Sequence, residues 1–363
     1  MDFIDLRTQY HRYQEEIGLR MKAVLQHGQF VMGPEIPELE KILADYVGAR
    51  HCVTAASGTD SLEIALRAAG IGPGDEVITV PFTWISSAEV ISLVGARVVF
   101  VDIEPETYNL DTGKIEAAIS PRTKAIIPVS LFGQMPDYDR INEIGRQKGV
   151  LVIEDAAQSF GATRNGRRSC GVTPVGSTSF FPAKPLGCYG EGGALFTSDD
   201  DLAERFRAIR SHGGLQRHEH WLVGMNGRFD SLQAAVLLAK WPHFEWELEE
   251  RRRIGARYTE KLRDYCVPPA ILPGNTHVYA QYTIRVPNRD EVARRLKANG
   301  IPTAVYYPKC LHEQPVFASA GYHQGDFPVA ERAAREVLSL PMHPFLSEKD
   351  QDLVIEALKS ALS

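Results

Sequence analysis

Three nearly continuous apolar runs restrict the fold of this chain more than any other feature of its sequence. They are ARVVFVDI at 96–103, TKAIIPVS at 123–130 and VLVIEDA at 150–156. Strands that are apolar on both faces are buried on both faces, and such strands belong to mainly parallel sheets covered by helices. The runs therefore predict an α/β protein with a layered structure.

Further strand and helix patterns alternate with these runs. Helical patterns cover 57–70 and about 84–94, and strand patterns are HCVTAA at 51–56, DEVITV at 75–80 and GALFTSDDD at 193–201. The aspartates that end the last of these strands are typical of a helix N-terminus. This repeated strand–helix order predicts a doubly wound sheet.

The character of the sequence changes after Arg228. A long helical stretch follows, which Pro242 interrupts and which is heavily charged beyond that proline. A strand pattern at 279–286 and a helical pattern at 289–300, stopped by a glycine, come next. We expect a large domain at 1–240, with an N-terminal segment that packs on the second domain, and a smaller C-terminal α+β domain at 241–363.

Composition narrows the class of partner and the compartment. The formal net charge of −6 argues against nucleic acid, because binding a polyanion requires a basic surface. The five cysteines are odd in number and form no CxxC pair, which favours reduced thiols in a cytoplasmic protein. The longest apolar run, at 90–103, is broken by Arg97 and too short to span a membrane, and the acidic N-terminus does not resemble a signal peptide.

Polar residues at the ends of two predicted strands are candidates for a ligand site. Asp155 ends an apolar strand, where open α/β sheets place their ligand crevice, although an aspartate there is more often a helix N-cap. Ser57, Gly58 and Thr59 lie between a strand and a helix, where backbone N–H groups and hydroxyls bind phosphate or simply cap the helix. Gln158, three residues after Asp155, is by itself more typical of a helix surface.

The stretch SFFPAKPLGCYGEGGALF at 179–196 places one lysine in apolar, glycine-rich surroundings. Lys184 either extends from a loop to the surface or is a desolvated amine for covalent chemistry. Pro182 and Pro185 stiffen its loop, and burial lowers the pKa of an amine toward the free base that Schiff-base formation needs. Trp84, after the strand at 75–80, is either a core residue or a ring that stacks on a planar ligand.

Together these residues match the needs of one cofactor, pyridoxal 5'-phosphate. It requires a lysine, a carboxylate for its pyridinium nitrogen, an aromatic ring beside it and a phosphate site lined by hydroxyl and amide groups. Lys184, Asp155 and Trp84 supply the first three, and Ser57–Thr59 with Ser179 supply the fourth. Each of them lies at a strand end or loop of the same predicted sheet.

Longer motifs carry a family resemblance over nearly the whole chain. They are FIDLRTQY, GQFVMGPEIPELE, SGTDSLEIAL, GPGDEVITVPFTW, VSLFGQ, VIEDAAQSFGA, SFFPAKPLGCYGEGGALFT, MNGRFDSLQAAVL and SLPMHPFL. The chain resembles the sugar aminotransferases of the DegT/DnrJ/EryC1/StrS family, which are pyridoxal phosphate enzymes of fold type I (aspartate aminotransferase-like). RRSCG, VYAQYTIRV and IPTAVYYP further resemble the WbpE/WlbC subgroup, which aminates C3 of a UDP-linked 3-keto-2-acetamido-2-deoxyglucuronic acid with L-glutamate as the donor, in lipopolysaccharide O-antigen biosynthesis.

The resemblance implies a role for each motif residue. Lys184 would form the Schiff base with the cofactor and move the proton, Asp155 would pair with the ring nitrogen, and Gln158 would contact the ring hydroxyl. Trp84 would stack on the ring, and Ser57, Gly58, Thr59 and Ser179 would hold the phosphate. Asn226 would reach the phosphate of a neighbouring subunit in a homodimer with shared active sites. The sugar-nucleotide site would comprise Gly28, Phe30, Arg228, Tyr306 and Tyr307, with Arg228 binding a carboxylate.

Two departures from the family pattern bear on the sugar. Tyr306 stands where relatives commonly have histidine, and Ala183 where close relatives have serine. Alternatives are therefore amination of C4 of a UDP-4-keto-6-deoxy sugar or of C3 of a dTDP-3-keto-6-deoxy sugar. Dehydratases of the family have histidine in place of the lysine, so Lys184 argues against that activity. A non-enzymatic regulator would be expected to lack part of the catalytic set, whereas Lys184, Asp155 and the phosphate-site residues are all present here. His212, His218 and His220 fit no structural zinc spacing, so we predict no metal.

Overall fold

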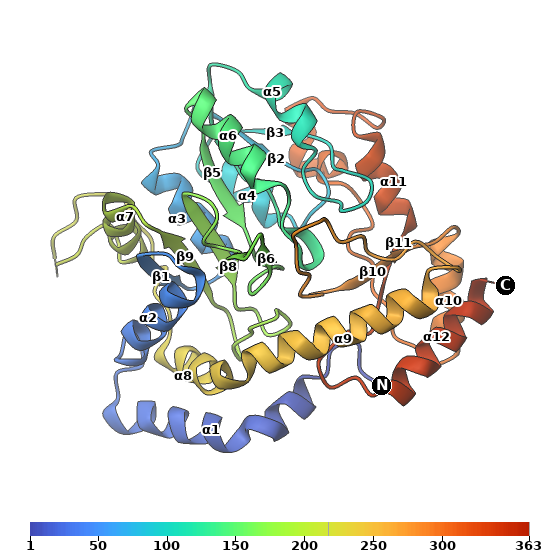
Figure 1. Ribbon diagram of the computed structural model, residues 1–363. Coiled ribbons are helices and arrows are strands. Elements are labelled where there is room, and N and C mark those ends of the chain that lie inside the picture. Colours follow the sequence, from blue (N-terminus) through green and yellow to red (C-terminus); the bar gives the residue numbers. More distant parts are fainter. Residues whose placement is uncertain (217, 363) are drawn as a thin grey trace.

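The computed structural model describes residues 1–216 and 218–362, and a seven-stranded sheet forms its centre (Figure 1). The strand order is β1-β9-β8-β5-β4-β2-β3, and only β9 runs antiparallel to its neighbours. These strands are β1 (His51–Ala55), β2 (Glu76–Thr79), β3 (Arg97–Phe100), β4 (Thr123–Ile126), β5 (Leu151–Asp155), β8 (Val175–Ser179) and β9 (Gly193–Thr197). The predicted α/β fold with a mainly parallel seven-stranded sheet is confirmed.

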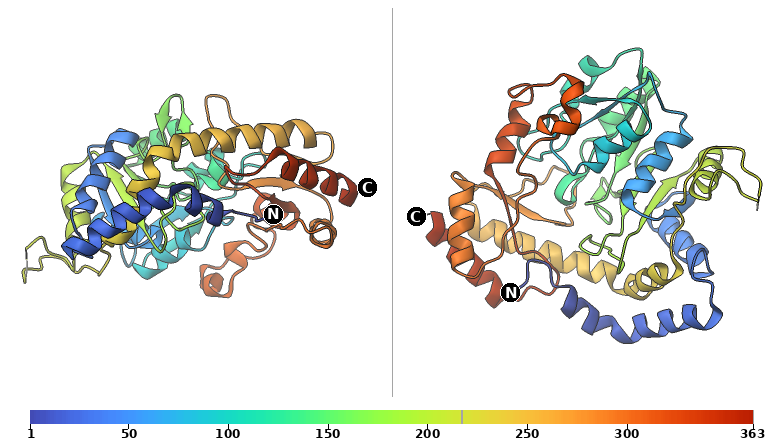
Figure 2. Two further views of the ribbon diagram at one scale, coloured as in Figure 1. Left: turned by 90° about the horizontal axis from the view of Figure 1, so that it is seen from below. Right: turned by 180° about the vertical axis from the view of Figure 1, so that it is seen from behind.

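Helices cover both faces of this sheet. The helix α6 lies on one face, and α3 and α4 lie on the other, as the front and rear views show (Figures 1 and 2). The helices of this part are α1 (Leu6–His27), α2 (Glu35–Val47), α3 (Gly58–Ala68), α4 (Ser86–Leu93), α5 (Ile115–Ala118), α6 (Tyr138–Lys148), α7 (Asp200–Arg210) and α8 (Ser231–Lys240). Asp199 caps α7 by accepting a hydrogen bond from the Leu202 amide, so the aspartate signal for a helix start is confirmed.

The long helical stretch divides where the proline predicted. The helix α8 ends at Lys240, a 3₁₀ turn at Trp241–His243 contains Pro242, and α9 (Phe244–Leu262) follows. Proline lacks the N–H that a continuous helix would need at this point. The chain then crosses along α9 toward a second, smaller sheet (Figure 1).

That second sheet pairs two antiparallel strands. They are β10 (Tyr282–Arg285) and β11 (Val337–Leu340), and they share a separate core with α9, α10 (Arg289–Ala298) and α12 (Glu348–Leu362). In contrast, Phe327, which directly precedes α11 (Pro328–Glu336), and Phe317, in a 3₁₀ segment at Pro315–Ala320, pack on the core of the large sheet. A short hairpin, β6 (Thr163–Arg164) with β7 (Arg167–Arg168), completes the strands described. The domain division at residue 240 stays a prediction, and residue 363 lies outside the described residues.

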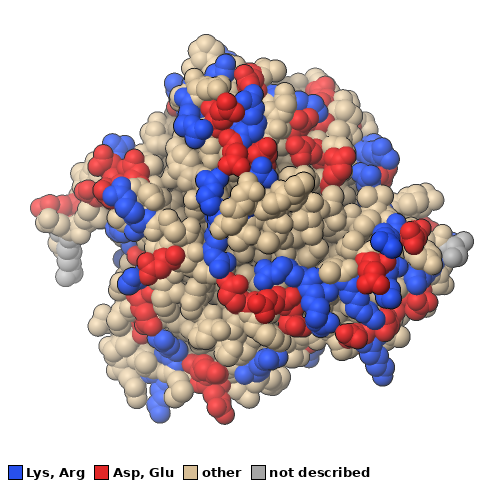
Figure 3. Space-filling model, viewed as in Figure 1, with Lys and Arg blue, Asp and Glu red and all other residues tan. Residues whose placement is uncertain are grey.

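The N-terminal helix packs beneath α8. Tyr13 and Ile17 on α1 are buried against Val236 and Ala239 on α8. Along α9, on the face shown in Figure 3, basic and acidic side chains are intermixed and form ion pairs such as Arg253–Glu250 and Arg257–Asp352. None of the described helices is both long and apolar enough to cross a membrane.

Candidate active site

A cavity of about 390 Å³ opens at the edge of the sheet where the carboxyl ends of the parallel strands meet. Because parallel strands all end at the same edge, residues that are far apart in the sequence come together there. The predicted residues that line it are Ser57, Gly58, Thr59, Trp84, Asp155, Gln158, Ser179, Lys184, Tyr306 and Tyr307. Ten residues singled out from sequence thus share one cavity.

Lys184 lies on a compact loop that follows β8. The Lys184 amide donates to the Phe181 carbonyl at 2.9 Å, and the Cys188 amide donates to the Phe180 carbonyl at 2.8 Å, so the loop closes on itself. Burial lowers the pKa of the Lys184 amine, and the charge of Asp155 opposes that shift. A lysine with a lowered pKa is more often neutral near pH 7, which nucleophilic and proton-transfer chemistry requires.

Asp155 ends β5 and is buried, with 6% of its surface exposed. Its carboxylate accepts hydrogen bonds from the Ser87 hydroxyl at 2.7 Å and from the Ala157 amide at 3.1 Å. Burial raises the pKa of this carboxyl, and the two hydrogen bonds and the charge of Lys184 oppose the rise. An anion in this position is suited to a cationic ring nitrogen, because an unpaired buried charge is costly.

The N-terminus of α3 forms the third part of the site. Ser57 caps this helix of 11 residues by accepting from the Asp60 amide, and the Thr59 hydroxyl lies 2.7 Å from the Ser86 hydroxyl. A Cβ atom at Gly58 would lie 2.6 Å from the Ser179 Cβ, so only glycine allows the helix to approach β8 this closely. Ser57, Thr59 and Ser179 thus bring three hydroxyl groups to the cavity beside a helix N-terminus, a combination that suits a phosphate.

Aromatic and amide groups form another part of the cavity lining. The ring centroids of Trp84 and Tyr307 lie 6.2 Å apart, and those of Tyr306 and Tyr307 lie 5.8 Å apart. Gln158 donates from Nε2 to the Tyr307 hydroxyl at 3.1 Å and accepts from the Phe132 amide at 2.8 Å. Trp84 is 59% exposed, which leaves its ring face available to a planar ligand.

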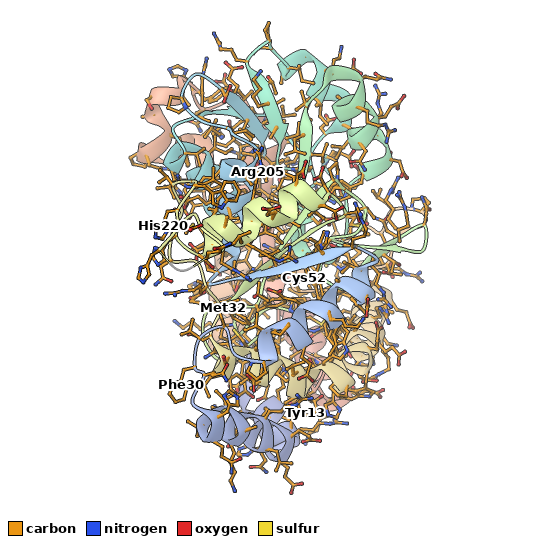
Figure 4. All side chains as sticks on the ribbon, turned by 90° about the vertical axis from the view of Figure 1, so that its left-hand side faces the viewer. Tyr13, Phe30, Met32, Cys52, Arg205 and His220 are labelled. Atoms are coloured by element: carbon orange, nitrogen blue, oxygen red, sulfur yellow. The ribbon has the colours of Figure 1, made fainter. Side chains whose placement is uncertain are left out.

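Four predicted residues lie outside the lining of this cavity. Gly28 ends α1, and Phe30 lies at the outer edge of the molecule between α1 and α2 (Figure 4). Asn226 is exposed and accepts a hydrogen bond from the Arg228 guanidinium at 2.9 Å. The roles predicted for these four residues stay predictions. The role predicted for Asn226 is in the site of a second copy of the chain.

Sequence reasoning missed several lining and supporting residues. Ser87, the hydroxyl partner of Asp155, lies in the same FTWISSAE stretch as Trp84, and this proximity was the available signal. Gln281, directly before β10, also lines the cavity, and so does Glu191, in the glycine-rich segment after Lys184. Within residues 1–216 and 218–362 there is no cluster of three or more potential metal ligands. The absence of a metal stays a prediction.

Comparison with known proteins identifies the family. The model of the DegT/DnrJ/EryC1/StrS aminotransferase family matches residues 11–359. The chain belongs to this family. It is 51% identical, over 99% of both chains, to the UDP-2-acetamido-2-deoxy-3-oxo-D-glucuronate aminotransferase of Pseudomonas aeruginosa. It is 47% identical to a pleiotropic regulatory protein of Geobacillus stearothermophilus, over 98% of this chain and 96% of that one.

Solved structures agree with this placement. A DegT/DnrJ/EryC1/StrS aminotransferase from Brucella abortus superposes with a TM-score of 0.97 at 44% identity, covering 99% of both chains. The NtdA protein of Bacillus subtilis, solved with bound cofactor PMP, has a TM-score of 0.92 at 30% identity, over 99% of this chain and 83% of that one. The predicted fold type, the aminotransferase activity and the pyridoxal phosphate cofactor are confirmed.

Proposed function

We propose that this enzyme transfers the amino group of L-glutamate to C3 of a UDP-linked 3-keto-2-acetamido-2-deoxyglucuronic acid. The observation that carries the proposal is the 51% identity, over 99% of both chains, to an aminotransferase named for that keto sugar. The product would be UDP-2-acetamido-3-amino-2,3-dideoxyglucuronic acid, a precursor for lipopolysaccharide O-antigen made in the cytoplasm. The joint presence of Lys184, Asp155 and the α3 phosphate site argues against a purely regulatory protein.

Lys184 is the residue that we assign to covalent and proton-transfer chemistry. Bound pyridoxal phosphate supplies a carbonyl carbon for amine exchange and a ring that takes up the electron pair left when a proton departs. Because burial lowers its pKa, the Lys184 amine would take the α-proton of the amino donor in the first half-reaction. In the second half-reaction, with the keto sugar, the same group would deliver a proton to C3 of the sugar. Its closed loop keeps that amine within the cavity.

Asp155 and the α3 site would orient the cofactor from two ends. The Asp155 carboxylate, held by Ser87 and the Ala157 amide, would keep the ring nitrogen protonated. Ser57, Gly58, Thr59 and Ser179 would hold the phosphate by hydroxyl and amide hydrogen bonds. Gln158 would contact the ring hydroxyl, and Trp84 would pack on the ring face.

Charge in the cavity supports a shared site in a homodimer. Among the described residues lining it, Lys184 is the sole lysine or arginine, whereas Asp155 and Glu191 are acidic. The ligands proposed here carry phosphate, diphosphate and carboxylate groups, so further cations are required. We propose that Asn226 and Arg228 of a second copy complete the site. Gly28 and Phe30 are proposed to line the sugar-nucleotide site of this dimer together with Tyr306 and Tyr307.

A panel of keto-sugar nucleotides tests the substrate. The purified enzyme, with glutamate, is offered the UDP-3-keto uronic acid, a UDP-4-keto-6-deoxy sugar and a dTDP-3-keto-6-deoxy sugar, and release of 2-oxoglutarate is measured. Turnover of the uronic acid alone, absent from a Lys184→Ala control, is expected. Turnover restricted to either 6-deoxy sugar would overturn the substrate assignment.

A further inference from the structure

A second buried lysine lies behind the loop that carries Lys184. Lys240 is the last residue of α8 and is 3% exposed. Its ammonium donates a hydrogen bond to the Gly187 carbonyl, three residues after Lys184, and lies 5.3 Å from the centre of the Tyr189 ring. The lysine therefore connects α8 directly to the active-site loop.

Two further contacts hold the loop that carries Lys184 closed and against α8. A Cβ atom at Gly187 would lie 2.4 Å from the Pro182 carbonyl oxygen, so the backbone on the two sides of Lys184 is in close contact. Gln233, also on α8, accepts a hydrogen bond from the Tyr189 amide at 2.8 Å. Both ties hold the C-terminal side of the loop against one helix.

The surroundings of Lys240 compensate its buried charge. Burial lowers its pKa to about 8, and the Glu247 carboxylate on α9 opposes this shift. Glu247 itself accepts from the Gln9 amide of α1 at 2.9 and 3.0 Å. Near pH 7 Lys240 thus remains an ammonium, with the Gly187 carbonyl as a partner. A charge is rarely kept in such a place unless it is paired.

We propose that Lys240 is a positioning residue, which holds the Lys184 loop against α8 and so places the reactive amine relative to Asp155. This inference rests on the assignment of Lys184 made above. Without the Gly187 contact, the loop would shift while the fold of the sheet persists. Misplacement of a reacting group by about 1 Å is enough to reduce turnover about 100-fold.

The test compares Lys240→Met with the wild type and with Lys349→Met, a matched loss of an exposed lysine on α12. We expect kcat to fall about 10- to 100-fold in Lys240→Met with KM for glutamate little changed. Hydrogen exchange in the peptide covering 180–190 should increase, in the full-length protein with and without cofactor. Lys240→Arg retains a cationic hydrogen-bond donor. It should therefore recover part of the wild-type kcat and part of the wild-type protection from hydrogen exchange at 180–190.

A merely structural role predicts a different result. It would lower the melting temperature while the folded variant kept wild-type kcat and wild-type exchange at 180–190, and that outcome overturns the proposal. If Lys240→Met does not fold, Lys240→Gln decides by the same exchange: an increase at 180–190 supports the proposal and no increase overturns it. Failure of this proposal is distinguishable from an error in the Lys184 assignment, because such an error would show in the wild type as cofactor attached to a residue other than Lys184.

Discussion

Replacing Asp155 with asparagine isolates the effect of one buried charge. Both hydrogen bonds to the carboxylate can survive the change: the amide oxygen can accept from the Ala157 amide, and the amide NH₂ can donate to the Ser87 hydroxyl. The side chains have nearly the same volume, so no cavity forms. What disappears is the negative charge that faces the proposed ring nitrogen.

The size of the effect follows from the kind of bond lost. A hydrogen bond to a charged group contributes about 1.5–3 kcal/mol, and each 1.4 kcal/mol is about tenfold in affinity or rate. Asp155→Asn should therefore weaken cofactor binding or kcat by about 10- to 150-fold. Stability of the cofactor-free chain should not fall. Burial raises the pKa of Asp155, so its ionised form opposes folding at neutral pH, and asparagine removes that cost.

The assay is titration of the cofactor-free enzyme with pyridoxal phosphate, together with kcat and the melting temperature of both forms. Asp45→Asn, an exposed aspartate on α2 paired with Lys41, is the matched control and should behave as the wild type. Wild-type cofactor affinity and turnover in Asp155→Asn would refute the reasoning. The reasoning would also be refuted if Asp155→Asn lowered the melting temperature of the cofactor-free chain as much as that of the cofactor-bound enzyme.

Two further predictions concern the phosphate site and stability against pH. Gly58→Ala places a methyl group 2.6 Å from the Ser179 Cβ, so cofactor affinity, measured by the same titration, should fall about tenfold or more, in line with about 1–3 kcal/mol for overpacking. Burial lowers the pKa of His277 to about 3, below about 6.5 for an unfolded chain, so the unfolded state binds more protons between these values. The contribution of His277 to the free energy of unfolding should therefore decrease as pH falls below about 6.5, by up to about 1.4 kcal/mol per pH unit. Urea unfolding at pH 7 and pH 5 measures this decrease, and it should be smaller in His277→Asn.

Apolar runs predicted three of the seven strands of the large sheet, because burial on both faces leaves a strong compositional signal. The strands β3, β4 and β5 all lie within the three runs. The strand β8 escaped prediction, since VGSTS is small and polar, and its burial comes from its neighbours β5 and β9. Tertiary context, rather than side-chain hydrophobicity, makes that segment a strand.

The cofactor side of the site was more predictable than the sugar side. Asp155 ends β5 and Ser57–Thr59 follow β1, and the topology of a parallel sheet brings such strand ends together. Lys184 was recognisable from its apolar, glycine-rich surroundings instead, because the strand before it was not predicted. Ser87 was missed because its role depends on the side-chain direction of α4, which the sequence pattern does not specify. Gly28, Phe30 and Arg228 lie outside the lining of the cavity, and their roles stay predictions.

Reduction of the wild-type holoenzyme with borohydride, followed by peptide mass spectrometry, tests the central assignment most directly. Reduction makes the lysine–cofactor bond permanent, so the modified residue can be read from the fragment masses. We predict that the cofactor is attached to Lys184, within residues 179–196. Attachment to another lysine, above all the buried Lys240, or an unmodified Lys184 in fully reduced protein, would contradict this account.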